Sequence, residues 1–192
     1  MDRMYIKDLK GLTVVSIAEG DKVGLINRIY LDPQSRKIGG LSVEPGGSLL
    51  EPDSRKLIDI DDIHSLGPDA LTLADKDAVC GDQTNERWME LVDLDDVVKE
   101  KVVTEGGEYV GQVTTIQFES STWSLTGVEV SPGFFRDNKM IGNEDVTTIG
   151  PELVIVSDSV CADTSEPAVT DEPDSQPRWV VEETATAERP QA

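Results

Sequence analysis

The sequence is short of cysteine, of basic residues and of long apolar runs. Its two cysteines, Cys80 and Cys161, are too few for a disulfide scaffold or a four-thiolate zinc site, and we expect free thiols. Seventeen Lys and Arg residues stand against 38 Asp and Glu, which gives the 192 residues a formal charge of −21. Because binding to the phosphate backbone of DNA or RNA depends on clustered Lys and Arg, we expect no nucleic-acid partner.

The apolar segments are also short. None approaches the roughly 20 consecutive apolar residues that a transmembrane helix needs, and the opening residues Met1-Asp2-Arg3 show no signal-peptide pattern. We therefore expect a cytoplasmic protein that inserts into no membrane. Docking to the cytoplasmic face of a membrane protein is compatible with this expectation.

The sequence contains an internal duplication. Residues 23–46 align without a gap to residues 110–133, an offset of 87, with seven identities in 24 pairs. Residues 56–75 align to residues 139–158, an offset of 83, with six identities in 20 pairs. A four-residue deletion in one loop of the second copy explains the change of offset. We infer two copies of one domain of about 70 residues.

The apolar residues of both copies change strand face at the same place. Side chains of a strand alternate between its two faces, yet Ile26 and Ile29 have opposite parity, and the second copy repeats this change. One extra residue in a strand reverses the faces of all residues that follow it. The pattern therefore predicts β-bulges at residues 27–28 and 114–115.

A second change of face lies beside Gly40 in the first copy and beside Gly127 in the second. Glycine at such a place fits the sharp bend of a strand at a barrel corner. The predicted strands are 4 to 9 residues long, turn-forming segments separate them, and no stretch of 11 residues has a helical period. The predicted fold class is all-β, with each copy closed into a small barrel.

The same residues resemble a known family. The order VG.I..I.LD, I.GL.V and K.I.I.DI..LGPDALTL in the first copy, and VG.V..I.FE, L.GV.V and K.I..EDV..IGPELVIV in the second, is similar to the PRC-barrel domain. The resemblance covers residues 6–75 and 93–158 and implies two tandem, six-stranded, SH3-like barrels. It also implies a docking role, since the family includes such modules on photosynthetic reaction centres, in a ribosome maturation factor and in small prokaryotic proteins. Its motifs are structural positions and not catalytic ones.

The predicted organisation has four parts. A first barrel spans residues 1–78, a connector residues 79–92, a second barrel residues 93–158 and a tail residues 159–192. The tail is acidic, is rich in Pro and Thr and lacks an alternating apolar pattern, so we expect it to be disordered.

The connector has the spacing of a short helix. Trp88, Leu91 and Val92 stand at positions i, i+3 and i+4 and would form one apolar stripe. We predict that this stripe packs between the two barrels and fixes their angle. A helix that binds a partner is the alternative.

No residue pattern indicates catalysis. His64 is the single histidine, and Thr147 replaces it in the second copy, so we expect an exposed residue without a catalytic role. The acidic run of Asp59, Asp61 and Asp62 has the oxygen ligands of a weak cation site but not the spacing of an EF-hand, and a solvated surface is the preferred interpretation. We predict no enzyme activity, no catalytic residue, no cofactor and no metal.

The favoured function is a non-enzymatic adaptor or scaffold that docks protein partners on both barrels. The copies differ most in the loop after their third strand, where each has an adjacent apolar pair, Leu49-Leu50 and Phe134-Phe135. Neighbouring side chains of a strand point to opposite faces, so one member of each pair would point outward and anchor a partner, unless the loop buries both. Trp179 in the tail is a further candidate, as a docking motif or as a clasp on the barrels.

Two other functions are kept as alternatives. A small-molecule or cation-binding regulator would hold its ligand between the barrels. A ribosome-assembly or RNA-processing accessory would act through a protein partner, an idea that rests on the family resemblance alone.

Overall fold

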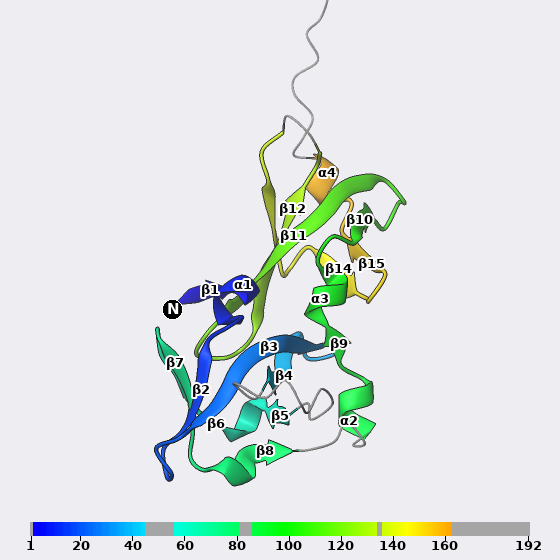
Figure 1. The fold of residues 1–192 in the computed structure, drawn as a ribbon. Helices are drawn as coiled ribbons and strands as arrows, with labels where there is room; N and C mark the ends of the chain where they lie inside the picture. The colour runs from blue at the N-terminus through cyan, green and yellow to red at the C-terminus, as the bar shows by residue number, and fades with distance from the viewer. Residues whose placement is uncertain (1, 45–55, 81–85, 134–135, 163–192) are drawn as a thin grey trace, which may run out of the picture.

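Each half of the chain folds into a small barrel, and the two barrels have the same design (Figure 1). The computed structural model describes residues 2–44, 56–80, 86–133 and 136–162. Among these residues, no helix is both long and apolar enough to cross a bilayer.

Strands dominate the first repeat. Its barrel strands are β2 (Thr13–Ser16), β3 (Lys22–Asp32), β4 (Lys37–Glu44), β5 (Lys56–Asp59), β6 (Ile63–Leu66) and β7 (Ala70–Leu73). The 3-10 turn η1 (Ile60–Asp62) joins β5 to β6, and η2 (Lys76–Ala78) leads into β8 (Val79–Cys80). The sheet order is β6-β7-β2-β3-β4-β5-β8, with β2 and β7 parallel.

The second repeat follows the same plan. Its barrel strands are β10 (Lys101–Thr104), β11 (Tyr109–Glu119), β12 (Leu125–Ser131), β13 (Lys139–Gly142), β14 (Val146–Ile149) and β15 (Leu153–Val156). They lie in the order β13-β12-β11-β10-β15-β14, with β10 and β15 parallel. The prediction of two tandem six-stranded barrels is therefore confirmed.

Both predicted bulges are present. The register of β3 against β4 shifts between Ile26 and Arg28, and that of β11 against β12 shifts between Val113 and Thr115. The second predicted change of face is also a register shift, beside Gly40 in the first repeat and at the equivalent place in the second. The extra residue lets long strands bend while their apolar side chains stay in the core on both sides of it.

The first strand and helix of the chain lie on the second barrel. Strand β1 (Arg3–Tyr5) pairs antiparallel with β11, where Met4 lies opposite Phe118. Helix α1 (Ile6–Leu9) then contacts the same strand (Figure 1). The chain enters its own barrel only afterwards, at β2.

The second repeat makes the equivalent contact with the first barrel. Strand β9 (Val92–Asp93) pairs antiparallel with β3 of the first barrel, where Val92 lies opposite Leu31, and helix α3 (Leu94–Val97) contacts β3. The pairing occurs at the positions equivalent to those of β1 and β11. The two repeats have thus exchanged their first strand and helix.

A pseudo-two-fold axis relates the repeats. Lys37 and Ser124, which are equivalent at the offset of 87, face each other in an isolated antiparallel bridge. The same hydrogen bond of 2.8 Å occurs once on either side of them, from the Ile38 N–H to the Trp123 carbonyl and from the Leu125 N–H to the Arg36 carbonyl. Contacts between equivalent residues are the mark of a two-fold interface. The buried apolar side chains of both repeats accordingly form one continuous cluster.

The connector packs on the first barrel. Helix α2 (Glu86–Met89) lies within the predicted helical segment, and its Trp88 ring meets Tyr30 edge-on, with the ring centroids 5.6 Å apart. Trp88 also covers Gly40, where a Cβ would fall 2.2 Å from the indole Cη2, and Leu91 packs on the glycine before it. These two members of the predicted stripe therefore cover the first barrel and not the space between the barrels, which corrects the prediction.

The fold continues beyond the predicted domain boundary at residue 158. Helix α4 (Ser159–Ala162) follows β15, as η2 and β8 follow β7 in the first repeat. Val160 is 4% exposed and belongs to the core cluster, and the Lys139 Nζ donates to its carbonyl at 2.6 Å. The rest of the predicted tail, from residue 163, lies outside the described residues.

Candidate functional site

The residues predicted to anchor partners all lie outside the described residues. They are Leu49, Leu50, Phe134, Phe135 and Trp179. The structure does describe the surface from which the Phe134–Phe135 loop emerges, between β12 and β13.

A hollow of about 320 Å³ lies at this surface. Pro132 and Arg136, which flank the loop on its two sides, both line the hollow. Apolar side chains from β11, β12 and α4 also line it, namely those of Val110, Val130 and Val160. Tyr109 lies beside them and is 55% exposed. The hollow thus combines an apolar lining with two basic side chains, Arg136 and Lys139, and two acidic ones, Glu108 and Asp137.

The strand next to this hollow ends its sheet. Among the described strands, β13 pairs with β12 alone, and its Met140 is 40% exposed. In the first repeat the equivalent strand, β5, is covered by β8. An uncovered edge presents backbone N–H and C=O groups to which another strand can add. We call the hollow and the β13 edge together the docking face.

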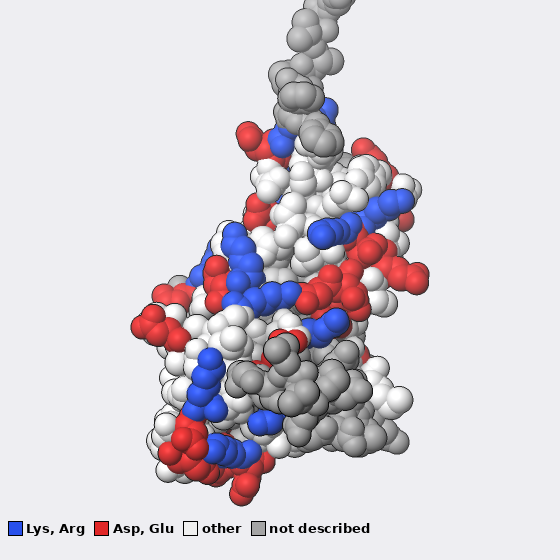
Figure 2. Space-filling view, viewed as in Figure 1, with Lys and Arg blue, Asp and Glu red and all other residues white. Residues whose placement is uncertain are grey.

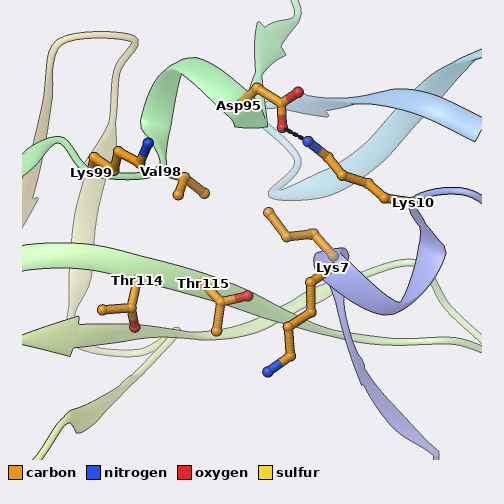
Figure 3. Close-up of a pocket in the computed structure, with 8 residues that line it drawn as sticks. Lys7, Lys10, Asp95, Val98, Lys99, Thr114 and Thr115 are labelled. Carbon is orange, nitrogen blue, oxygen red and sulfur yellow. Dashed lines mark hydrogen bonds and ion pairs between the residues drawn. The ribbon is translucent and has the colours of Figure 1, made fainter.

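A second hollow, of about 360 Å³, lies where the exchanged elements meet (Figure 3). Helix α1 and the residue after it supply Lys7 and Lys10, while α3 and the turn that follows it supply Asp95 and Lys99. The bulge of β11 supplies the remaining polar side chains, Thr114 and Thr115. We call this hollow the junction pocket, because both repeats contribute to it.

The three lysines of the junction pocket have different partners. The Lys10 Nζ forms an ion pair with Asp95, which ties the start of the first repeat to α3. The Lys7 Nζ lies 4.9 Å from the centroid of the Tyr5 ring, a cation–π contact. Lys99 forms no ion pair with any described residue.

Lys99 has a strained backbone. Its φ is +83°, in the left-handed region that side chains with a Cβ rarely adopt, at a cost of about 1–2 kcal/mol. The equivalent residue of the first repeat is Gly11, with a φ of +77°. The turn therefore requires this conformation in both repeats, and only the second repeat places a long side chain there.

Thr115 carries a buried hydroxyl without a partner. The residue is 6% exposed, and its Oγ1 makes no hydrogen bond within the described part of the chain. An unpartnered buried hydroxyl costs about 1–3 kcal/mol. Figure 3 shows this hydroxyl turned from β11 toward α1, on the pocket side of the strand.

The first repeat fills the equivalent position differently. Arg28 replaces Thr115 at the bulge, and its guanidinium donates to Asp93 at 2.5 Å. This hydrogen bond, together with the negative charge of Asp93, raises the pKa of Arg28 above its ordinary value. The polar side chain at the bulge of the first repeat is thus satisfied by an ion pair with β9 of the second repeat, whereas Thr115 at the equivalent bulge has no hydrogen-bond partner among the described residues.

The acidic run forms a turn at the surface. Asp59 caps η1 by accepting from the Asp61 N–H at 3.1 Å, and its other oxygen accepts from Arg87 at 2.6 Å. His64 is exposed on β6. Within the described ranges, no three His, Cys, Asp or Glu side chains are grouped as a metal site would need.

Both cysteines are free thiols. Cys80 is exposed on β8, and Cys161 is half-buried on α4. Burial, followed by the negative charge of Glu108, raises the pKa of the Cys161 thiol. Because the thiolate is the reactive form, this shift lowers the reactivity of Cys161 at neutral pH.

Comparison with known proteins agrees with the duplicated barrel. The family model of the PRC-barrel domain matches residues 1–78 and 89–159, one match in each repeat. The chain belongs to the PRC-barrel family. A search of curated proteins found no match. PRC-barrel domains are typically non-catalytic, and their shared positions in this chain are the strands, bulges and turns already described.

Reasoning from the sequence missed the junction pocket. Lys7 and Lys99 are 92 residues apart, and only the exchange of α1 brings them to one place. The alignment of the repeats did hold a signal. At the offset of 87 it sets Thr115 against Arg28. The match of Lys99 to Gly11 comes only from the structure, where the two backbone N–H groups donate to the equivalent carbonyls of Val113 and Ile26.

Proposed function

We propose that this tandem PRC-barrel protein is a non-enzymatic adaptor, acting in the cytoplasm, that docks protein partners. The observation that supports the proposal is the docking face of the second barrel. There, a hollow with apolar side chains is lined by Pro132 and Arg136, which flank Phe134 and Phe135 in the sequence, and it adjoins β13, which no second described strand covers.

Two kinds of recognition can act together on such a face. The β13 edge would pair with an extended segment of the partner, and main-chain hydrogen bonds would supply affinity. The hollow would accept an apolar side chain of that segment, which supplies specificity. The hollow is lined by equal numbers of basic and acidic side chains, so the apolar contact and the strand pairing, and not the sign of the partner's charge, would decide recognition.

The arrangement of the barrels suits an adaptor. Because the repeats share one core and exchange their first elements, a surface on each barrel has a fixed distance and direction from the other. Two sites held rigidly bind a two-site partner with a high effective concentration. In the first barrel the corresponding anchors would be Leu49 and Leu50.

The proposal is tested by capturing partners from the source cell on the full-length chain and comparing single Phe134→Ser and Phe135→Ser variants. We expect one of the two to abolish binding of a stoichiometric protein while the melting temperature stays nearly unchanged. Leu49→Ser and Leu50→Ser are matched changes in the first barrel, and a chain that ends at residue 162 tests Trp179.

Two outcomes would reject this proposal. In the first, both phenylalanine variants unfold the second barrel, so that the pair belongs to the core. In the second, neither variant changes partner binding. The adaptor role also requires that DNA and RNA do not bind at physiological salt, since the formal charge is −21. Micromolar binding that weakens steeply with added salt would contradict that part.

A further inference from the structure

We propose that the junction pocket binds a small, multiply charged oxyanion, a compound bearing phosphate or several carboxylates. This site is separate from the docking face and does not depend on the adaptor role. Its volume of about 360 Å³ lies within the range of pockets that hold small molecules, about 300–1,000 Å³.

The charge of the pocket is opposite to that of the chain. Three lysines and one aspartate line it, whereas the whole sequence has a formal charge of −21. Lys10 and Asp95 neutralise each other in their ion pair, which leaves Lys7 and Lys99 to attract an anion. Figure 2 shows basic side chains gathered at the level where the two barrels meet, near α1 and α3 in Figure 1.

The Thr115 hydroxyl gives the site a fixed polar group. It is buried, lines the pocket and has no hydrogen-bond partner among the described residues. A buried hydroxyl is rarely left without a partner in a folded protein. An oxyanion bound between α1 and β11 would accept its hydrogen bond, and charge-assisted hydrogen bonds of this kind are the strong ones.

The other repeat shows that the pocket is not required by the fold. At the equivalent positions the first repeat has Gly11, which suits the left-handed turn, and Arg28, which is paired with Asp93. The second repeat instead has a lysine with a strained backbone and a threonine without a partner among the described residues, and both lower the stability of the fold. Strain and unsatisfied groups of this kind cluster at binding sites, where a ligand compensates for them.

The sequence had suggested a small molecule or a cation between the barrels. The lining of the junction pocket favours an anion instead, because a cation would meet three ammonium groups and one already paired carboxylate. The oxygen atoms of phosphate or carboxylate match both the lysine ammonium groups and the threonine donor.

The experiment is a titration of the full-length, ¹⁵N-labelled chain, followed by amide NMR shifts. Inorganic phosphate and citrate are the two probes, and sodium chloride at matched ionic strength is the control. We expect shifts that saturate at residues 6–10, 95–99 and 114–115, with a dissociation constant on the order of 1 mM or below. The equivalent bulge residues of the first repeat, 27–28, are an internal control and should not move in this way.

Two variants test whether the side chains of Thr115 and Lys99 bind the anion. Thr115→Val removes the hydroxyl and keeps the shape, so we expect binding to weaken about tenfold while the melting temperature without ligand stays the same or rises. Lys99→Gly restores the residue of the first repeat, and we expect the same weakening with a gain in stability. Lys22→Gln, an exposed lysine outside the pocket, should bind as the unchanged chain does.

Saturation by phosphate alone identifies a phosphate-bearing ligand, and saturation by citrate alone a polycarboxylate; either supports the proposal. The proposal is overturned if neither probe saturates, or if the shifts are spread over lysines of the whole surface as they are with chloride. It is also overturned if Thr115→Val and Lys99→Gly both bind as the unchanged chain does. Partner capture by the docking face is measured separately, so either proposal can fail alone.

Discussion

Asp32 closes the turn between β3 and β4 with its carboxylate. The Ser35 hydroxyl donates to Oδ2 at 2.7 Å, and the Gln34 N–H donates to Oδ1 at 2.9 Å. These hydrogen bonds, that of the Ser35 hydroxyl first, lower the pKa of Asp32 in the folded protein. The lowered pKa makes a contribution to stability that is present above the unfolded pKa of about 3.9. It is lost as the pH falls through the folded value.

We predict that Asp32→Asn lowers the free energy of unfolding at pH 7 more than at about pH 3, which lies below the unfolded pKa of about 3.9, so that the carboxyl of the unfolded chain is mostly protonated there. Urea unfolding at the two pH values measures the difference. Asp69→Asn, at an exposed position in the turn between β6 and β7, is the control for loss of a charge. An equal effect of Asp32→Asn at both pH values would show that the ionised form contributes nothing special to the turn.

Helix α2 depends on a glycine in a different element. The Trp88 ring fits against β4 only because Gly40 has no side chain, since a Cβ there would lie 2.2 Å from the indole and 3.0 Å from the Ile58 carbonyl oxygen. The contact places Trp88 edge-on to Tyr30 and attaches the connector to the first PRC barrel.

We predict that Gly40→Ala destabilises the protein by about 1–3 kcal/mol, because the indole must move out of its site. Chemical unfolding gives the loss, and Trp fluorescence reports the displaced ring. The same glycine change in a Trp88→Ala background is the control, and most of its cost should disappear there. If the cost is the same in both backgrounds, the clash is with the β5 carbonyl and not with the connector.

The strands and bulges were predictable because each pattern occurs twice. A single break in parity at Ile26 and Ile29 would be weak, but the same break at Val113 and Ile116 fixes the bulge in both repeats. The exchange was not predictable. β1 and β9 have only three and two residues, and the local pattern is the same whether such a strand pairs with its own barrel or with the other.

For the candidate site, too, local features could be predicted from the sequence but contacts between the repeats could not. The loop pairs were predicted as anchors because they differ between the copies, and Pro132 and Arg136, which flank one pair in the sequence, line the docking face. The junction pocket was missed because its lining comes from both repeats, and the sequence gives no distance between residues such as Lys7 and Lys99. Packing of one repeat on the other, and not local propensity, brings these side chains together.

The two PRC barrels share one core across the pseudo-two-fold axis. Leu9 of α1 and Val97 of α3 are both fully buried in it, so each repeat loses part of its covering if the other unfolds. We predict a single cooperative unfolding transition for the chain, with equal calorimetric and van't Hoff enthalpies. Differential scanning calorimetry measures both quantities.

A divided chain provides the control for this prediction. Residues 1–80 alone lack β9 and α3, which cover β3, and should not fold as a monomer. Addition of the second half should restore folding in an equimolar complex. Two separate calorimetric transitions, or a stable monomer of residues 1–80, would show that the barrels are independent.

The exchange of first elements also bears on how the two halves came to differ. When two identical chains assemble around a two-fold axis, every substitution is present at two places. A destabilising residue therefore lowers the stability of the assembly twice, and a new surface is always duplicated. Joining both halves in one polypeptide removes that constraint. The first half can keep Gly11 and also Arg28, whose ion pair with Asp93 joins it to the second half, while the second half accepts Lys99 and Thr115 at the cost of some stability. Covalent fusion of this kind turns a symmetric scaffold into a molecule with two ends that can acquire different tasks.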